Sequence, residues 1–161
     1  MKTLGVDPGA SGGLALIDSQ SSGTIAVVMP DSLQGLVAFV RQHAPDLAIV
    51  ESVHAFPGQG VTSCFTFGKA YGSVLGVLAA LSVPVVTVGP KAWHKAVLGI
   101  PEMPSSWSKA DRRKEWKRLA CAHAALRWPT VSLLASPRCK VAHDGIADAL
   151  CIASYAQHMI E

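Results

Sequence analysis

Four carboxylate residues stand where core elements of the chain begin or end. Asp7 and Glu51 each close a short apolar run, while Asp144 and Asp148 are spaced i, i+4, so that a helix would present both on one face. Only 11 of the 161 residues are acidic. A charge on a core element is costly unless hydrogen bonds or a metal ion compensate it. The four acids therefore predict a divalent-metal site.

The chemistry follows from the ligand type. Hard cations such as Mg²⁺ prefer carboxylate oxygens, and two ions held close together can activate a water molecule and stabilise the leaving oxygen of a phosphodiester. Taken singly, each acid has a simpler interpretation: Asp7 as a turn residue, Glu51 as a surface acid, Asp144 as a helix N-cap. The joint pattern favours metal-dependent phosphodiester chemistry.

Positive charge is concentrated in one part of the chain. The net charge is +3, but residues 91–140 hold 11 Lys and Arg against 3 Asp and Glu, whereas residues 141–161 hold no basic residue. A basic block beside an acidic metal site suits a polyanionic substrate. A solvated helix is the alternative, since six of these residues fall in one predicted helix: Lys109, Arg112, Arg113, Lys114, Lys117 and Arg118.

The elements that must position these groups can be read from the apolar pattern. Strands are predicted over residues 3–7, 14–18, 24–29, 47–51 and 85–88. Helices are predicted over residues 31 or 32–43, 65–81, 90–98, 108–126 and 142–158. The first three strands are expected to be antiparallel, and the order predicts an α/β fold with a mixed five-stranded sheet flanked by helices. We expect a single domain over residues 1–161.

Other features narrow the class of protein. The longest apolar run, residues 74–88, is broken by Gly, Ser, Pro and Thr, so no membrane association is expected. No secretory signal pattern is present. The four cysteines are scattered without zinc-finger spacing, which indicates incidental thiols in a reducing compartment. A cytoplasmic location is predicted, with an organelle or a phage-infected cell as alternatives.

Several motifs together resemble a known family. The segments Gly5-Val6-Asp7-Pro8-Gly9, Val50-Glu51 and Ala147-Asp148-Ala149-Leu150 are similar to the motifs of RuvC-type Holliday-junction resolvases, which have an RNase H-like fold. Three further segments resemble the phage-type and organellar branch: Gly58-Gln59-Gly60, Phe67-Gly68 and Pro90-Lys91-Ala92-Trp93. The resemblance extends from residue 3 to about residue 155.

This resemblance implies a homodimeric endonuclease that cuts two opposed strands of a four-way DNA junction with Mg²⁺ or Mn²⁺. Water would attack the scissile phosphorus and leave a 5′-phosphate. Asp7, Glu51 and Asp148 match metal-binding catalytic positions, and Lys109 resembles a lysine near the active site. The fourth metal ligand is Asp144 by its register, with the adjacent His143 as the competing candidate.

DNA-binding residues are expected around these acids. Gly58, Gln59 and Gly60 could approach a backbone and read a base edge, and Phe56 and Phe65 could stack on unpaired bases. For Phe67, stacking on a base and packing in the core are both open interpretations. Basic candidates for phosphate contact are Lys69, Lys91, Lys95, Arg112 and Arg113. The helix with Gly72 and Gly76 is either a dimer interface or a buried core helix.

Three rival functions remain. An actin-like or sugar-kinase-type phosphate-binding domain could share Asp7-Pro8-Gly9, but it needs a second subdomain. A DNA-binding module without catalysis would have lost one of the acids. Another RNase H-fold nuclease, acting on RNA–DNA hybrids or flaps, would share the metal chemistry and differ only in the nucleic-acid shape that it recognises.

Overall fold

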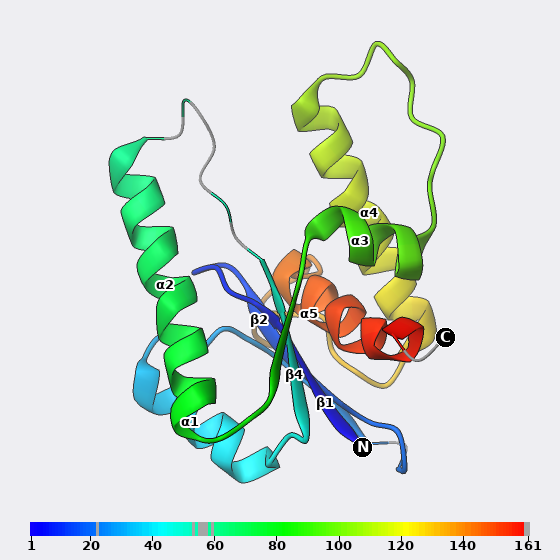
Figure 1. Ribbon diagram of the computed structural model, residues 1–161. Helices are drawn as coiled ribbons and strands as arrows, with labels where there is room; N and C mark the ends of the chain where they lie inside the picture. The colour runs from blue at the N-terminus through cyan, green and yellow to red at the C-terminus, as the bar shows by residue number, and fades with distance from the viewer. Residues whose placement is uncertain (22, 53, 55–57, 59, 160–161) are drawn as a thin grey trace.

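The computed structural model describes residues 1–21, 23–52, 54, 58 and 60–159. Its centre is a five-stranded sheet in the order β3-β2-β1-β4-β5 (Figure 1). The strands are β1 (Lys2–Asp7), β2 (Gly13–Asp18), β3 (Thr24–Val28), β4 (Leu47–Glu51) and β5 (Val85–Val88). The first three are antiparallel, and β4 and β5 continue parallel to β1. The predicted mixed sheet is confirmed.

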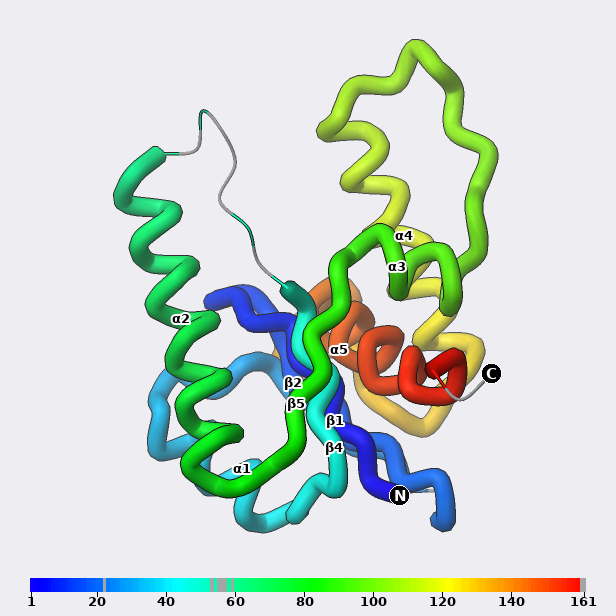
Figure 2. Tube along the Cα trace, in the orientation of Figure 1, coloured from blue at the N-terminus to red at the C-terminus, as the bar shows by residue number. Residues whose placement is uncertain are grey.

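Helices cover both faces of this sheet. They are α1 (Leu33–His43), α2 (Val61–Ala80), α3 (Pro90–Trp93), α4 (Lys109–Arg127) and α5 (Asp144–Ser154). A π-helical turn (His94–Leu98) extends α3, and a 3₁₀ turn (Tyr155–Met159) follows α5. In Figure 2, α1 and α2 lie on one side of the strands, and α5, α4 and α3 lie on the other. No helix among the described residues is long and apolar enough to cross a bilayer.

Strand alternation creates the two cores. On β1, Leu4 and Val6 face α1 and α2, where they pack with Val40 and Leu78. On the other face, Ile49 of β4 joins a cluster built largely from α5 and α4. Since both faces of the central strands are covered, their continuous apolar character is explained.

Three glycines allow α5 to lie directly on the sheet. A Cβ atom on Gly5 would come within 2.2 Å of the Ala149 carbonyl oxygen, and one on Gly13 within 2.4 Å of the Gly145 carbonyl oxygen. A Cβ on Gly145 would in turn lie 2.3 Å from the carbonyl oxygen of Ser11. The start of α5 is therefore held against β2 and the turn before it, and the later turns of α5 are held against β1.

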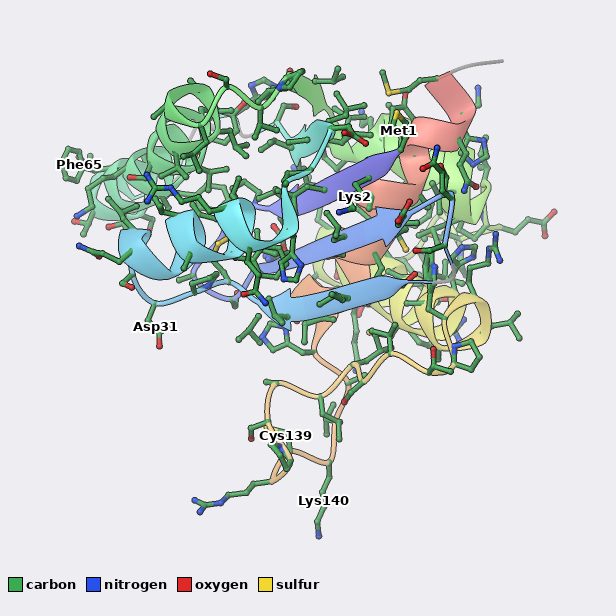
Figure 3. The ribbon with its side chains drawn as sticks, turned by 90° about the horizontal axis from the view of Figure 1, so that it is seen from below. Met1, Lys2, Asp31, Phe65, Cys139 and Lys140 are labelled. Carbon is green, nitrogen blue, oxygen red and sulfur yellow. The ribbon has the colours of Figure 1, made fainter. Side chains whose placement is uncertain are left out.

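Most predicted boundaries agree with the structure, and the differences have local causes. Ser32 caps α1 by accepting a hydrogen bond from the Gly35 N–H at 3.1 Å. The helix predicted from residue 65 begins at Val61, because Gly60 in extended conformation serves as its N-cap. The last helix begins at Asp144, with His143 as N-cap. Between α4 and α5 the chain projects from the body at Cys139 and Lys140 (Figure 3).

Candidate active site

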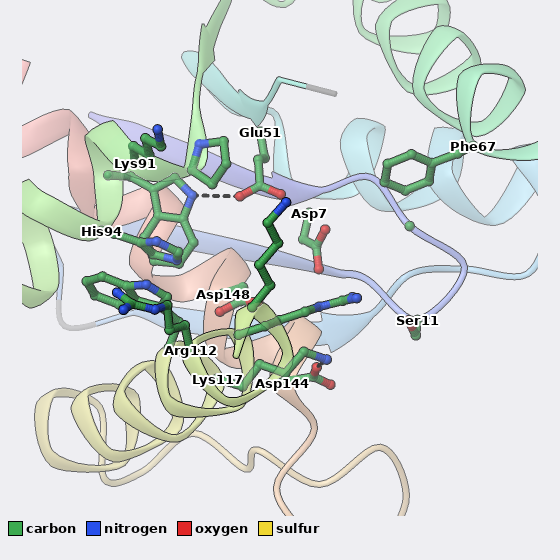
Figure 4. A pocket seen from close by; sticks show the side chains of 16 residues that line it. Asp7, Ser11, Glu51, Phe67, Lys91, His94, Arg112, Lys117, Asp144 and Asp148 are labelled. Atoms are coloured by element: carbon green, nitrogen blue, oxygen red, sulfur yellow. Dashed lines mark hydrogen bonds and ion pairs between the residues drawn. The ribbon is translucent and has the colours of Figure 1, made fainter. Parts of the chain in front are cut away.

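Asp7 and Glu51 lie together because β1 and β4 are parallel neighbours. Val6 is paired with Val50, so the next residue of each strand leaves the sheet at the same edge. Both side chains line a cleft of about 620 Å³ (Figure 4). This is the carboxyl-end edge at which α/β sheets commonly form their sites.

Asp144 and Asp148 reach the same cleft from α5. They are one helical turn apart, and the glycine contacts of α5 with β1 and β2 set the helix close enough to face Asp7. The cleft thus receives four carboxylates from two strands and one helix. His143, the competing candidate for the fourth position, is not among the residues that line the cleft, and its Nδ1 is buried without a hydrogen-bond partner in the described structure.

The carboxylates disturb one another strongly. Burial, followed by the negative charges of Glu51 and Asp144, raises the pKa of Asp7 to about 7. Burial and the same kind of repulsion, led by Asp7, raise the pKa of Asp148 to about 8. Burial also raises the pKa of Glu51, against the lowering effect of a hydrogen bond from Trp93. With all four acids ionised, the site would therefore hold more negative charge than its own basic residues compensate.

Lys117 of α4 compensates part of that charge. Its ammonium group pairs with the Asp144 carboxylate. Burial opposes ionisation of Asp144, but the hydrogen bond and charge of Lys117 outweigh it and lower the pKa of this residue. Asp144 differs in this respect from Asp7 and Asp148, which have no such partner among the hydrogen bonds and ion pairs of the described residues.

The donor set fits hard divalent cations, since it consists of carboxylate oxygens under mutual repulsion that a cation would relieve. Within the described residues, no three His, Cys, Asp or Glu side chains are already drawn together as a ligand group. This is expected where like charges repel and where Lys117 neutralises Asp144. Asp7, Glu51, Asp144 and Asp148 are the residues that would hold the ions.

A basic wall faces the acids. Lys91, Lys109, Arg112 and Arg113 all line the cleft. The charge of Arg113 acts on Asp7. Arg112 donates hydrogen bonds to the carbonyl oxygens of Trp107 and Pro104, so its guanidinium also holds the loop before α4. The cleft combines an acidic floor with a cationic rim, an arrangement suited to a phosphodiester backbone.

Other predicted residues lie elsewhere. Lys69 lines a second cavity of about 550 Å³ between α2 and the start of α1. Lys95 is exposed and outside the cleft, and Phe65 is 72% exposed on α2. Gly58 and Gly60 are exposed, whereas Phe56 and Gln59 lie outside the described residues.

The structure places three residues for which the sequence left two interpretations open. Phe67 lines the cleft opposite the basic wall (Figure 4). Gly72 and Gly76 are exposed on α2, and nothing in the described structure lies within 4 Å of a Cβ placed on either. The buried face of α2 is instead formed by Val74 and Leu78.

Trp93, His94, Trp116 and Lys117 were not predicted as site residues, yet all line the cleft. The indole N–H of Trp93 donates to Glu51 Oε1 at 2.7 Å. The His94 ring stacks on Trp116, with centroids 4.2 Å apart and planes 8° from parallel. The Pro-x-x-Trp motif drew attention to Trp93, but nothing in the sequence indicated that its indole would donate a hydrogen bond to Glu51.

The chain has relatives among known proteins. No protein-family model matches the chain. It is 36% identical over 111 residues to the crossover junction endodeoxyribonuclease RuvC of Nitratidesulfovibrio vulgaris, covering 60% of this chain and 66% of that protein. RuvC of Sorangium cellulosum is 31% identical over 115 residues, covering 62% and 63%. The chain thus spans just under two thirds of the length of the curated relatives that it matches.

Solved structures show the same fold. Thermus thermophilus RuvC aligns over 99% of this chain and 97% of its own, with a TM-score of 0.60 and 20% identity. The Fowlpox virus resolvase, solved with Holliday junction DNA, aligns over 100% of both chains, with a TM-score of 0.56 and 15% identity. The predicted RNase H-like α/β fold is confirmed.

Proposed function

We propose that this chain, a homologue of the RuvC-type Holliday-junction resolvases, is a metal-dependent endonuclease that resolves four-way DNA junctions by paired nicks. One observation carries the proposal: four carboxylates from β1, β4 and α5 line the same cleft as five Lys and Arg side chains. The acids suit cations at a scissile phosphate, and the basic residues suit the flanking phosphates.

The residues divide into three roles. Asp7, Glu51, Asp144 and Asp148 hold Mg²⁺, for which Mn²⁺ can substitute. When bound, such ions would lower the pKa of the attacking water and stabilise the leaving 3′ oxygen, so that the phosphate would remain on the 5′ end at the nick. Lys109, at the first turn of α4 and lining the cleft, stabilises negative charge on the scissile phosphate.

The remaining candidates bind DNA. Lys91, Arg112 and Arg113 contact phosphates at the rim of the cleft. Beyond the rim, Lys69 and Lys95 extend the contact surface along the arms of a junction. Phe65 of α2 stacks on an unpaired base, and the sequence before α2 contributes Phe56, Gly58, Gln59 and Gly60 as further DNA-binding candidates.

Paired nicks require two active sites, and we propose a homodimer. The support is the exposed face of α2, where Gly72 and Gly76 leave room for close approach by a second helix. Light scattering of the purified protein tests this directly. A monomer at all concentrations, with and without junction DNA, would contradict the dimer.

The function is tested with three substrates of equal length: a four-way junction, a linear duplex and an RNA–DNA hybrid. We expect Mg²⁺-dependent, symmetric nicks in the junction alone. Cutting of the hybrid instead would favour another RNase H-fold nuclease, and ATP hydrolysis without nicking would favour a kinase-like domain.

Asp7→Asn provides the matched control for that experiment. It keeps the size of the side chain and removes the charge, so cleavage should be lost while junction binding persists. Undiminished cleavage by this variant would exclude Asp7 from the reaction and with it the proposed site.

A further inference from the structure

Trp93 is the largest of the fully buried side chains, with 1% of its surface exposed, and yet its polar atom faces the site. The indole N–H donates to Glu51 Oε1 at 2.7 Å (Figure 4). Among the hydrogen bonds of the described residues, no other neutral side chain donates to one of the four acids. A buried Trp that spends its one donor on a candidate metal ligand needs an explanation.

The indole is suited to orient a carboxylate without neutralising it. Its N–H can only donate and carries no positive charge, so the bond does not cancel the charge of the ionised Glu51 carboxylate. One lone pair of Oε1 is occupied, which fixes the carboxylate plane and leaves the other oxygen available to a cation. A Lys or Arg donor would instead cancel the charge, as Lys117 does at Asp144.

The donor is itself held in place. The Trp93 ring meets His94 edge-on, with centroids 4.0 Å apart, and His94 stacks on Trp116 of α4. Burial lowers the pKa of His94 to about 4, so this ring is neutral at physiological pH. The three rings connect Glu51 at the end of β4 to α4, the helix that carries Lys109, Arg112 and Arg113 of the basic wall.

We propose that Trp93 is a positioning residue: its indole N–H orients Glu51 for divalent-cation binding, and the His94 and Trp116 rings fix the indole. This inference rests on the proposed metal-dependent function and deepens it. Donors that orient a metal ligand in this way commonly change metal affinity by 10- to 100-fold when removed.

The test is Trp93→Phe, which keeps an aromatic ring and removes the N–H. Binding of Mn²⁺, measured by isothermal titration calorimetry without DNA, should weaken about 10-fold. Junction cleavage should fall at limiting Mg²⁺ and recover at high Mg²⁺, while junction binding in the absence of metal stays unchanged. Trp128→Phe is the matched control, because Trp128 lies outside the cleft and against His123; it should bind Mn²⁺ like the parent protein.

A double-mutant cycle separates positioning through Glu51 from general damage to the fold. With Glu51→Gln already present, Trp93→Phe should have little further effect on Mn²⁺ affinity. An equal loss in both backgrounds, or an unchanged affinity in the single variant, overturns the proposal.

If Trp93→Phe does not fold, 3-benzothienylalanine at position 93 retains the bicyclic shape and replaces the N–H by sulfur. A 10-fold loss of Mn²⁺ affinity in this variant would support the proposal, and no loss would overturn it. A failure of the parent protein to cut junctions would reject the proposed function. Because Mn²⁺ binding is measured without substrate, the role of Trp93 in metal binding would still be tested independently.

Discussion

Gly5 of β1 lies so close to Ala149 of α5 that the strand has no room for a side chain there. A Cβ atom at position 5 would be 2.2 Å from the Ala149 carbonyl oxygen, which belongs to the backbone and cannot swing away. The distance between β1 and α5 is set by this contact. That distance in turn decides how near Asp148 comes to Asp7.

Gly5→Ala should therefore separate α5 from the sheet. We expect a loss of about 1–3 kcal/mol in the free energy of unfolding, as for other overpacked cores, together with a large loss of cleavage. Chemical denaturation and junction cleavage measure the two effects. Gly68→Ala on α2 is the control: nothing in the described structure lies within 4 Å of the added Cβ, so stability should be kept or rise.

The raised pKa values of Asp7 and Asp148 predict how the metal-free protein responds to pH. Because both carboxyls are protonated in the folded state at pH values where the unfolded chain is ionised, stability should fall as pH rises. With pKa values of about 7 and about 8, the loss between pH 6.5 and 8 should be roughly 2 kcal/mol. The lowered pKa of His94 makes stability rise with pH, but this effect is confined to pH values below 6.5, the pKa of a histidine in the unfolded chain.

Thermal unfolding in EDTA at several pH values checks this window. In Asp148→Asn the slope should be much shallower, and at pH 8 the variant should be more stable than the parent protein. A parent protein whose stability rises steadily from pH 6.5 to 8 would show that the two carboxyls are not buried together as described.

Lys117 should compete with divalent cations for Asp144. Lys117→Met removes the ammonium and frees the carboxylate, so Mn²⁺ affinity should rise about threefold to tenfold, equivalent to at most about 1.4 kcal/mol. Calorimetric titration without DNA measures it. Lys114→Met removes the same charge from an exposed position of α4 outside the cleft and should change the affinity much less. Weaker binding in Lys117→Met would instead mean that Lys117 supports the site.

The basic wall should determine how DNA binding depends on salt. Lys109→Ala removes one phosphate contact, so the slope of log affinity against log salt should fall by about 1. Cleavage should decrease as well, because Lys109 lines the cleft with the acids. Lys140→Ala, on the projecting segment between α4 and α5 (Figure 3), should leave the slope unchanged. Fluorescence anisotropy of a labelled junction at several salt concentrations compares the two variants.

Much of the fold could be predicted because its signals are local. The apolar runs of β4 and β5 match the observed Leu47–Glu51 and Val85–Val88, and Ser32 is an ordinary N-cap. The meeting of Asp7 and Glu51 required only that two strands be parallel neighbours. The prediction that Asp144 and Asp148 point to the same side required only that they lie on one helix.

The unpredicted features depend on contacts between distant segments. The hydrogen bond from Trp93 to Glu51 joins residues 42 positions apart. It forms only because α3, which follows β5 in the chain, lies beside the end of β4. The pairing of Lys117 with Asp144 depends on how α4 packs against α5. The roles of Gly5 and Gly145 as contact points are likewise invisible in sequence, where a glycine indicates a turn as readily as a close approach.

The contact of α5 with β1 also makes the proposed ligand set depend on the last part of the chain to be translated. A chain translated only as far as α4 already contains Asp7 and Glu51, but it lacks Asp144, Asp148 and the helix that covers Gly5. Such a nascent chain can neither complete the ligand set nor bury that face of the sheet. Under the proposed function, we therefore expect no cutting by a chain that ends before α5.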